Sequence, residues 1–199
     1  MNTWSTVGPL AVLFGAVFTN NILLTNYLGM CSFLAISREV KSSVGLGVAV
    51  VFVMTMTNAL NWPIYYYVLV PLDLTYLGFI VYIIVIAGTV QLVEMIIERV
   101  SEPLYNSLGI FLPLITVNCA VFGAVLFMFI REYDFLAALA YGVGGGAGWA
   151  LAIIAMAGIR QKIAKAPIPK GLEGPGITLI TAGIMALAFM GFSGMLRAS

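Results

Sequence analysis

The sequence predicts an all-α integral membrane protein that crosses the bilayer six times. Hydrophobic residues make up 62% of its 199 residues, charged residues make up only 9%, and the mean hydropathy is +1.08. Soluble domains carry far more charge than this. A helix needs roughly 20 apolar residues to cross the hydrocarbon core, and the chain offers six apolar stretches near this length. They cover residues 7–36, 44–60, 76–97, 108–130, 135–159 and 176–196.

The whole chain, residues 1–199, is expected to form a single transmembrane domain. The longest polar connection, residues 160–175, is too short to be a soluble domain. The lipid bilayer is therefore the first expected partner. A net charge of +1 gives no indication of nucleic-acid binding, so no nucleic-acid partner is expected.

The first segment is predicted to be a retained but interrupted span. It lacks the basic start and the small-residue cleavage site of a signal peptide. As one helix, residues 7–36 would be about 45 Å long, more than a core of about 30 Å requires. Asn20, Asn21 and Asn26 interrupt it. Such amides are costly in lipid unless they satisfy freed backbone groups or line a protein interior.

The second and third segments are uninterrupted apolar runs, and the third contains an acid, Glu94. An acid within a span indicates by default a role in ion passage. Glu94 nevertheless lies one turn from Glu98 and Arg99, about 6 Å from the end of the segment. From there it could instead reach the interface or pair with Arg99.

The fourth segment is expected to be broken as the first one is. Pro113 removes a helical hydrogen bond and kinks the chain. Thr116, Asn118 and Cys119 follow it, and the two polar side chains could satisfy the freed backbone or surround a site. A roughly helical path places Cys119 about 18 Å from either end of this segment, near the midplane.

The fifth segment is rich in glycine, and the sixth is an ordinary apolar run. Gly142 and Gly146 are four residues apart, as are Gly144 and Gly148. This small-xxx-small spacing predicts close helix packing. No Lys-Ser or Lys-Thr pair follows these glycines, which argues against a phosphate-binding loop.

The positive charges predict the orientation of the chain, because they concentrate on cytoplasmic loops. Three connections share most of them: Arg38, Lys41, Arg99, Arg160, Lys162, Lys165 and Lys170 follow the first, third and fifth segments, whereas only Arg131 and Arg197 lie on the other side. Both termini should therefore face the periplasmic side of a bacterial inner membrane. Three spans in each half also predict two inverted repeats, about residues 7–100 and 104–198, which usually place a functional site near the midplane.

Cys31 and Cys119 are the only cysteines, and the chain contains no histidine. One interpretation is that both cysteines are small packing residues, as buried free cysteines often are. A second is a disulfide between them, although no exposed disulfide framework exists here. A third interpretation is metal binding, for which an iron–sulfur cluster suits soft thiolates without histidine. Such a cluster requires four cysteines, so a second protein chain would have to supply two of them.

Three motifs carry a resemblance to a known family. They resemble the integral subunits shared by the sodium-translocating NADH:quinone reductase and the Rnf ferredoxin:NAD oxidoreductase. The motifs are residues 21–36, with 28–34 around Cys31; residues 104–120 around Cys119; and residues 176–183 with 192–194. The resemblance covers essentially the whole chain. Most motifs, among them 30–33, 45–49, 116–118 and 148–153, are most similar to the E subunit of the quinone reductase. The compact outer loop at 70–77 instead resembles the A subunit of Rnf.

The resemblance implies one component of a six-subunit, ion-translocating oxidoreductase, which would not be catalytic alone. It implies a [2Fe–2S] cluster shared with a homologous, oppositely oriented membrane protein, similar to the D subunit of the quinone reductase or the E subunit of Rnf. Flavins and quinone would lie in other subunits. The ligands carried over by motif are Cys31 and Cys119, with Thr116 and Asn118 as neighbours. The alternative of another class is a small inverted-repeat transporter or channel, with Glu94 and the asparagines along its pathway.

Overall fold

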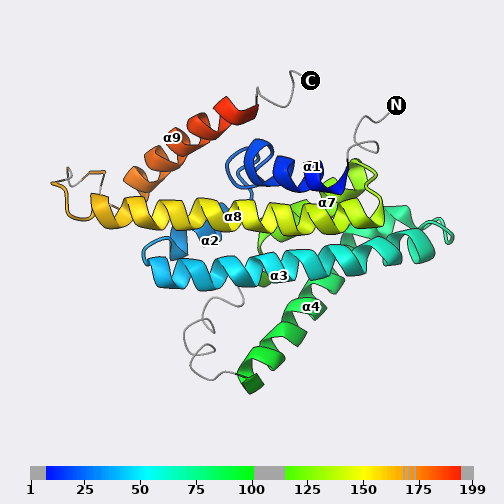
Figure 1. Ribbon diagram of the computed structural model, residues 1–199. Helices are drawn as coiled ribbons and strands as arrows, with labels where there is room; N and C mark the ends of the chain where they lie inside the picture. Colours follow the sequence, from blue (N-terminus) through cyan, green and yellow to red (C-terminus); the bar gives the residue numbers. More distant parts are fainter. Residues whose placement is uncertain (1–7, 101–114, 168, 170, 173, 194–199) are drawn as a thin grey trace.

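The computed structural model describes residues 8–100, 115–167, 169, 171, 172 and 174–193, and this part of the chain contains helices and no strand. The helices are α1 (Pro9–Phe14), α2 (Met30–Ile36), α3 (Val40–Ile64), α4 (Gly78–Val100), α7 (Cys119–Ile130), α8 (Phe135–Ile163) and α9 (Pro175–Ser193) (Figure 1). Two π-helical turns, Gly15–Thr19 and Tyr65–Leu69, continue α1 and α3, and a 3-10 turn, Thr75–Leu77, precedes α4.

Three helical stretches are long and apolar enough to cross a membrane: Val40–Leu69, Thr75–Ile96 and Phe135–Ile163. Three shorter apolar helices cover Pro9–Thr19, Cys119–Ile130 and Pro175–Gly191. Each of the six predicted segments therefore contains an apolar helix. This agrees with a membrane protein, while the count of six crossings stays a prediction.

Several helices extend beyond the apolar segments that predict them. Helix α3 begins at Val40 rather than at residue 44, and α8 continues to Ile163 rather than ending at residue 159. Hydropathy detects only the apolar part of a helix, whereas lysine, arginine and glutamine are themselves good helix formers. As a result Arg160, expected in a loop, lies in the last turn of α8.

Each cysteine stands at the start of a helix that follows a break. The first segment is helical to Thr19, then irregular until α2 begins at Met30. In the second half, the chain leaves helical geometry at Asn118, which has extended backbone angles, and α7 begins at Cys119. Pro113, predicted to cause this break, lies outside the described residues.

Helix α8 lies at the centre of the fold, between α1 and α3 (Figure 1). A Cβ on Gly146 would come within 2.7 Å of Val51 of α3, and one on Gly142 within 3.1 Å of Thr55. Since one residue number rises as the other falls, α3 and α8 run antiparallel. On the opposite side, a Cβ on Gly144 would lie 2.7 Å from the carbonyl oxygen of Leu13.

The glycine pairs of α8 thus face two different neighbours. Gly148 continues the second contact, because its Cβ would lie 3.0 Å from the carbonyl of Val17. Residue numbers rise together along this contact, so α1 and α8 run parallel. The small-xxx-small pairs do support close helix packing, which confirms that prediction.

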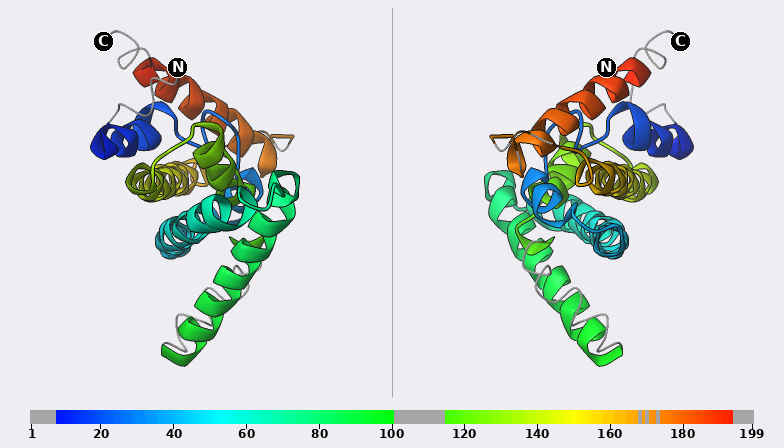
Figure 2. Two further views of the ribbon diagram at one scale, coloured as in Figure 1. Left: turned by 90° about the vertical axis from the view of Figure 1, so that its right-hand side faces the viewer. Right: turned by 90° about the vertical axis from the view of Figure 1, so that its left-hand side faces the viewer.

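Helix α4 leaves the bundle, as both views in Figure 2 show. Its first turns pack against α7, where the rings of Tyr82 and Phe129 stack with centroids 4.8 Å apart. Farther along, Leu92 and Ile96 are about 60% exposed. An apolar helix with so little cover within its own chain is what a membrane or a partner protein would surround.

Candidate cysteine site

The structure brings the segment that carries Cys31 against Cys119. Cys31 is the second residue of α2 and Cys119 is the first residue of α7. The backbone N–H of Gly29, two residues before Cys31, donates a hydrogen bond to Cys119 Sγ at 2.9 Å. Both thiols are free and exposed on the surface of the chain. Neither thiol is therefore buried within this chain, and Cys119 lies against the residue that precedes the helix of Cys31.

Gly29 occupies a place that only glycine fits. Its φ of +84° is in the left-handed region, which glycine adopts without steric cost. A Cβ there would lie 2.6 Å from Trp149 Nε1, 2.9 Å from Asn118 Oδ1 and 3.0 Å from Ala120 Cβ. Three side chains thus fill the space that a side chain at position 29 would need.

Asn118 joins the starts of the two helices. Its Oδ1 accepts the backbone N–H of Ala120 at 3.0 Å, which caps the N-terminus of α7. Its Nδ2 donates to Ser32 Oγ at 3.3 Å, and that hydroxyl donates to the carbonyl of Gly29 at 3.1 Å. Asn118 thus satisfies one N–H of the new helix and contacts α2, and its predicted role at the helix break stays a prediction.

The three asparagines of the first break have different environments. Asn21 is fully buried: its Nδ2 donates to the carbonyl of Gly148 at 2.7 Å and to that of Val17 at 3.2 Å. Its Oδ1 accepts the backbone N–H of Leu23 at 3.1 Å. Asn20 is half-buried at the end of the π-helical turn, and Asn26 is exposed. Of the three, Asn21 is the residue that organises the break.

A groove of about 300 Å³ lies beside Cys119. Ile83 and Ile86 of α4 form one wall, and Phe122 of α7 forms part of the other. Thr116, a predicted neighbour of the site, also lines it and is half-buried. The walls are largely apolar, so the sulfur sits at the edge of an apolar hollow.

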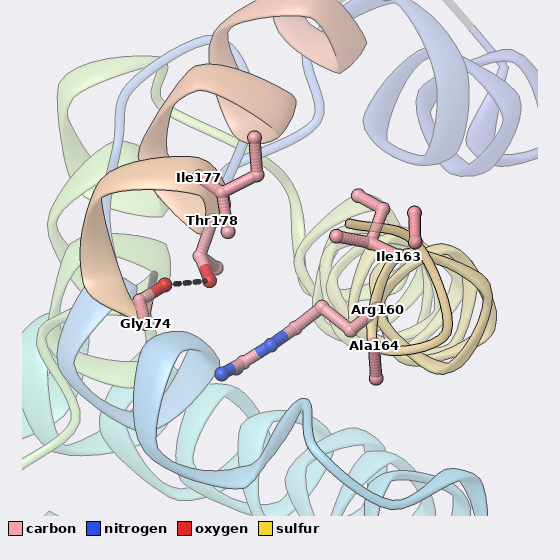
Figure 3. Close-up of a pocket in the computed structure, with 7 residues that line it drawn as sticks. Arg160, Ile163, Ala164, Gly174, Ile177 and Thr178 are labelled. Atoms are coloured by element: carbon pink, nitrogen blue, oxygen red, sulfur yellow. Dashed lines mark hydrogen bonds between the residues drawn. The ribbon is translucent and has the colours of Figure 1, made fainter. Parts of the chain in front are cut away.

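Arg160 fixes the far end of the helix that carries Cys31. Its Nη1 donates to Ser37 Oγ at 2.7 Å and to the carbonyl of Leu34 at 3.0 Å, at the C-terminal end of α2. A cation at this end stabilises a helix. Arg160 also lines a pocket of about 230 Å³. Figure 3 shows its side chain extending from α8 toward the start of α9, where Ile177 and Thr178 line the same pocket.

Glu94 is not brought to the cysteines. It is half-buried on α4, eight residues beyond Ile86. Eight helical residues correspond to about 12 Å. Its predicted role in ion passage stays a prediction.

Sequence reasoning missed four residues of the site: Gly29, Ser32, Trp149 and Arg160. Gly29 carried a usable signal, because glycine beside a predicted helix break often has a positive φ. Trp149 and Arg160 carried none, since their roles depend on contacts with residues more than 110 positions away in the sequence.

The donor set of this chain fits half of an iron–sulfur site. Among the described residues, no group of three or more histidine, cysteine, aspartate or glutamate side chains comes close enough together to hold a metal ion. A [2Fe–2S] cluster held by cysteines requires four thiolates. Two exposed thiols with an N–H donor on one sulfur agree with a pair that a second chain would complete.

The fold and the site define a helical membrane protein with a pair of exposed thiols at its helix breaks. Residues 10–196 match the profile of the Rnf-Nqr family, described as "Rnf-Nqr subunit, membrane protein". The chain belongs to this family, which confirms the resemblance in its motifs.

Two relatives are similar over almost the whole chain. The E subunit of the Na(+)-translocating NADH-quinone reductase of Aeromonas salmonicida is 54% identical over 192 residues, covering 94% of this chain and 97% of the relative. The protein of the same name from Aeromonas hydrophila subsp. hydrophila is 53% identical with the same coverage. Both names agree with the prediction of an oxidoreductase component that is more similar to the quinone reductase than to the Rnf branch.

Proposed function

We propose that this chain is the E subunit of a sodium-translocating NADH:quinone reductase, and that Cys31 and Cys119 are its two ligands to a shared [2Fe–2S] cluster. The observation that carries the proposal is the hydrogen bond of 2.9 Å from Gly29 N–H to Cys119 Sγ. It joins the two cysteine-bearing helix starts, although the cysteines are 88 positions apart in the sequence.

The exposure of both thiols supports a shared site rather than a site within this chain. Inert packing cysteines are usually buried, whereas Cys31 and Cys119 are exposed. A second chain can therefore approach both sulfurs. The partner we propose is a homologous membrane protein in the opposite orientation, which would supply the other two cysteines, within a complex of six subunits whose flavins and quinone lie elsewhere.

Residues of this chain would hold and shield such a site. Asn118 and Ser32 tie the start of α7 to the start of α2, so the two sulfurs keep a fixed relation. Ile83, Ile86 and Phe122 give one sulfur an apolar surrounding that limits water. The cluster itself would supply one-electron transfer, and hydrogen bonds and exposure at its sulfurs would tune its potential.

We further propose that the chain lies in the inner membrane with both termini on the periplasmic side. The hydrogen bond between Arg160 and Ser37 brings the basic connections that follow the first and fifth segments to one end of the bundle. At the other end, Trp62 Nε1 donates to the carbonyl of Tyr133 at 3.0 Å, next to Arg131. This separation of charge supports the orientation that the positive-inside rule predicts.

The test is an EPR spectrum of the complex purified with all of its subunits. We expect a [2Fe–2S] signal that disappears in C31S and in C119S, whereas A35S, an exposed change on the same helix, keeps it. Loss of quinone reduction with NADH should accompany loss of the signal. If both cysteine variants kept the signal and the electron transfer, the proposal would fail. Activity with NADH and not with reduced ferredoxin would support the quinone reductase over the Rnf complex.

A further inference from the structure

We propose that Trp149 is a positioning residue for the cysteine site, which holds Gly29 so that its backbone N–H stays directed at Cys119 Sγ. This inference rests on the proposed cluster, because the effect it predicts is on the reduction potential of that cluster. Trp149 itself lies on α8, outside both helices that carry the cysteines.

The indole of Trp149 is placed by packing and not by a hydrogen bond. The side chain is fully buried, yet its Nε1 has no hydrogen-bond partner among the described residues. Buried donors without an acceptor are uncommon and costly. The same nitrogen lies 2.6 Å from the point that a Cβ of Gly29 would occupy. The indole edge therefore fills the space where a side chain at position 29 would go.

Two side chains near Cys119 close the same side of Gly29 together with the indole. Asn118 Oδ1 and Ala120 Cβ lie 2.9 Å and 3.0 Å from the same point, and both belong to the chain around Cys119. The Cβ side of Gly29 is thus closed jointly by α8 and by the start of α7, so the backbone at position 29 cannot shift in that direction. With Gly29 confined in this way, its N–H meets the sulfur at 2.9 Å.

Helix α8 holds both ends of the first break through two consecutive residues. The carbonyl of Gly148 accepts the Asn21 amide at 2.7 Å, near the start of the irregular segment. The next residue, Trp149, packs against Gly29 at the end of that segment. The position of the Gly29 N–H therefore depends on α8 as much as on the loop itself.

A hydrogen bond to a ligand sulfur changes the potential in a known direction. Reduction adds negative charge to a cluster and its sulfurs, so an N–H donor stabilises the reduced form and raises the potential. Loosening Gly29 should lower the potential without removing a ligand. This separates a positioning role from ligation, in which loss of the residue removes the cluster.

The experiment compares four single variants and one double variant, G29A/W149F, in the complete purified complex. W149F removes the indole nitrogen and its ring edge, and G29A adds the Cβ that the indole excludes. W62F is the matched tryptophan control, because the Trp62 indole donates to the Tyr133 carbonyl away from the cysteines. G158A is the matched glycine control on α8, since no atom lies within 4 Å of its added Cβ. The measurement is the midpoint potential of the [2Fe–2S] signal in an EPR-monitored redox titration.

We expect W149F to shift the midpoint potential to lower values, and W62F and G158A to leave it at the wild-type value. G29A should shift it further or reduce the cluster content, and the double variant G29A/W149F should regain part of that content. An unshifted potential in W149F would overturn the inference, even if G29A failed to assemble. Absence of any cluster signal in the wild-type complex would instead overturn the proposed function.

Discussion

Arg160 at the end of α8 donates a hydrogen bond of 2.7 Å to the hydroxyl of Ser37, 123 positions earlier in the sequence. The same Nη1 donates to the carbonyl of Leu34. Ser37 is the C-cap residue of α2, so the guanidinium caps the short helix that contains Cys31. A helix of seven residues is marginal by itself. Its stability must come from tertiary contacts such as this one.

We therefore expect R160Q to destabilise the chain and loosen the helix of Cys31. Hydrogen bonds from a charged donor contribute about 1.5–3 kcal/mol. The melting temperature of the detergent-solubilised complex should fall, and the [2Fe–2S] content should fall with it. The control is K165Q, a change at an exposed basic residue beyond the end of α8. It should lower neither the melting temperature nor the [2Fe–2S] content. Equal melting temperatures for the two variants would contradict the capping role.

Substitution of the asparagines of the first break by aspartate should have very different effects on stability. N21D keeps the acceptor oxygen of Asn21 but loses the donor to the Gly148 carbonyl, so two oxygens would face each other. Each buried polar group left without a partner costs about 1–3 kcal/mol. N26D, at an exposed position, should be tolerated. The melting temperature and the yield of assembled complex are measured for both variants. If N21D were tolerated as well as N26D, the contacts of Asn21 would not be what stabilises the break.

Adjacent glycines of α8 provide a test of the helix contact. In G146A the new Cβ would lie 2.7 Å from Val51 Cα, a backbone atom that cannot move alone. Overpacking of this kind costs about 1–3 kcal/mol. In G145A the nearest atom, Met54 Sδ, is 3.4 Å away and flexible. We expect a lower melting temperature and poorer assembly for G146A only. The reverse order of the two variants would contradict the antiparallel contact of α3 and α8.

The cap of α7 should be separable from the link to α2. N118A removes both the cap on Ala120 N–H and the donor to Ser32. N118S keeps an oxygen suited to capping but loses the donor. Loss of an N-cap costs about 0.5–2 kcal/mol. Melting temperatures should therefore fall in the order wild type, N118S, N118A. If N118S were as unstable as N118A, the Ser32 contact and not the cap would dominate.

The fold was predictable where hydropathy alone decides. Each apolar segment contains a helix, and the glycine spacing of α8 indicated close packing that the contacts of Gly142 and Gly146 bear out. The ends of α3 and α8 were less predictable, because charged residues such as Arg160 continue a helix without any apolar signal.

The sequence predicted the side chains of the candidate site, but not the backbone and packing contacts around them. Cys31, Cys119 and Asn118 stand out as polar or soft groups in apolar surroundings. In the structure the neighbours of Cys31 make the contacts: Gly29 bonds to Cys119, and Ser32 bonds to Asn118. The Gly29 contact with Cys119 was not predictable, since a backbone N–H has no signature in sequence. The position of Trp149 was hidden for another reason: a buried tryptophan in an apolar helix resembles any other core residue.

The central place of α8 has a consequence for how the protein is made. Helices α1 and α3 emerge first from the ribosome, but their glycine-lined partner spans residues Phe135–Ile163. Until about two thirds of the chain has been synthesised, α1 and α3 lack the face of α8 against which they pack. We therefore expect α1 and α3 to be only loosely associated in the membrane at first. They should pack stably only after α8 has inserted between them. A chain truncated before α8 should be cleared by proteolysis instead of accumulating as a stable half.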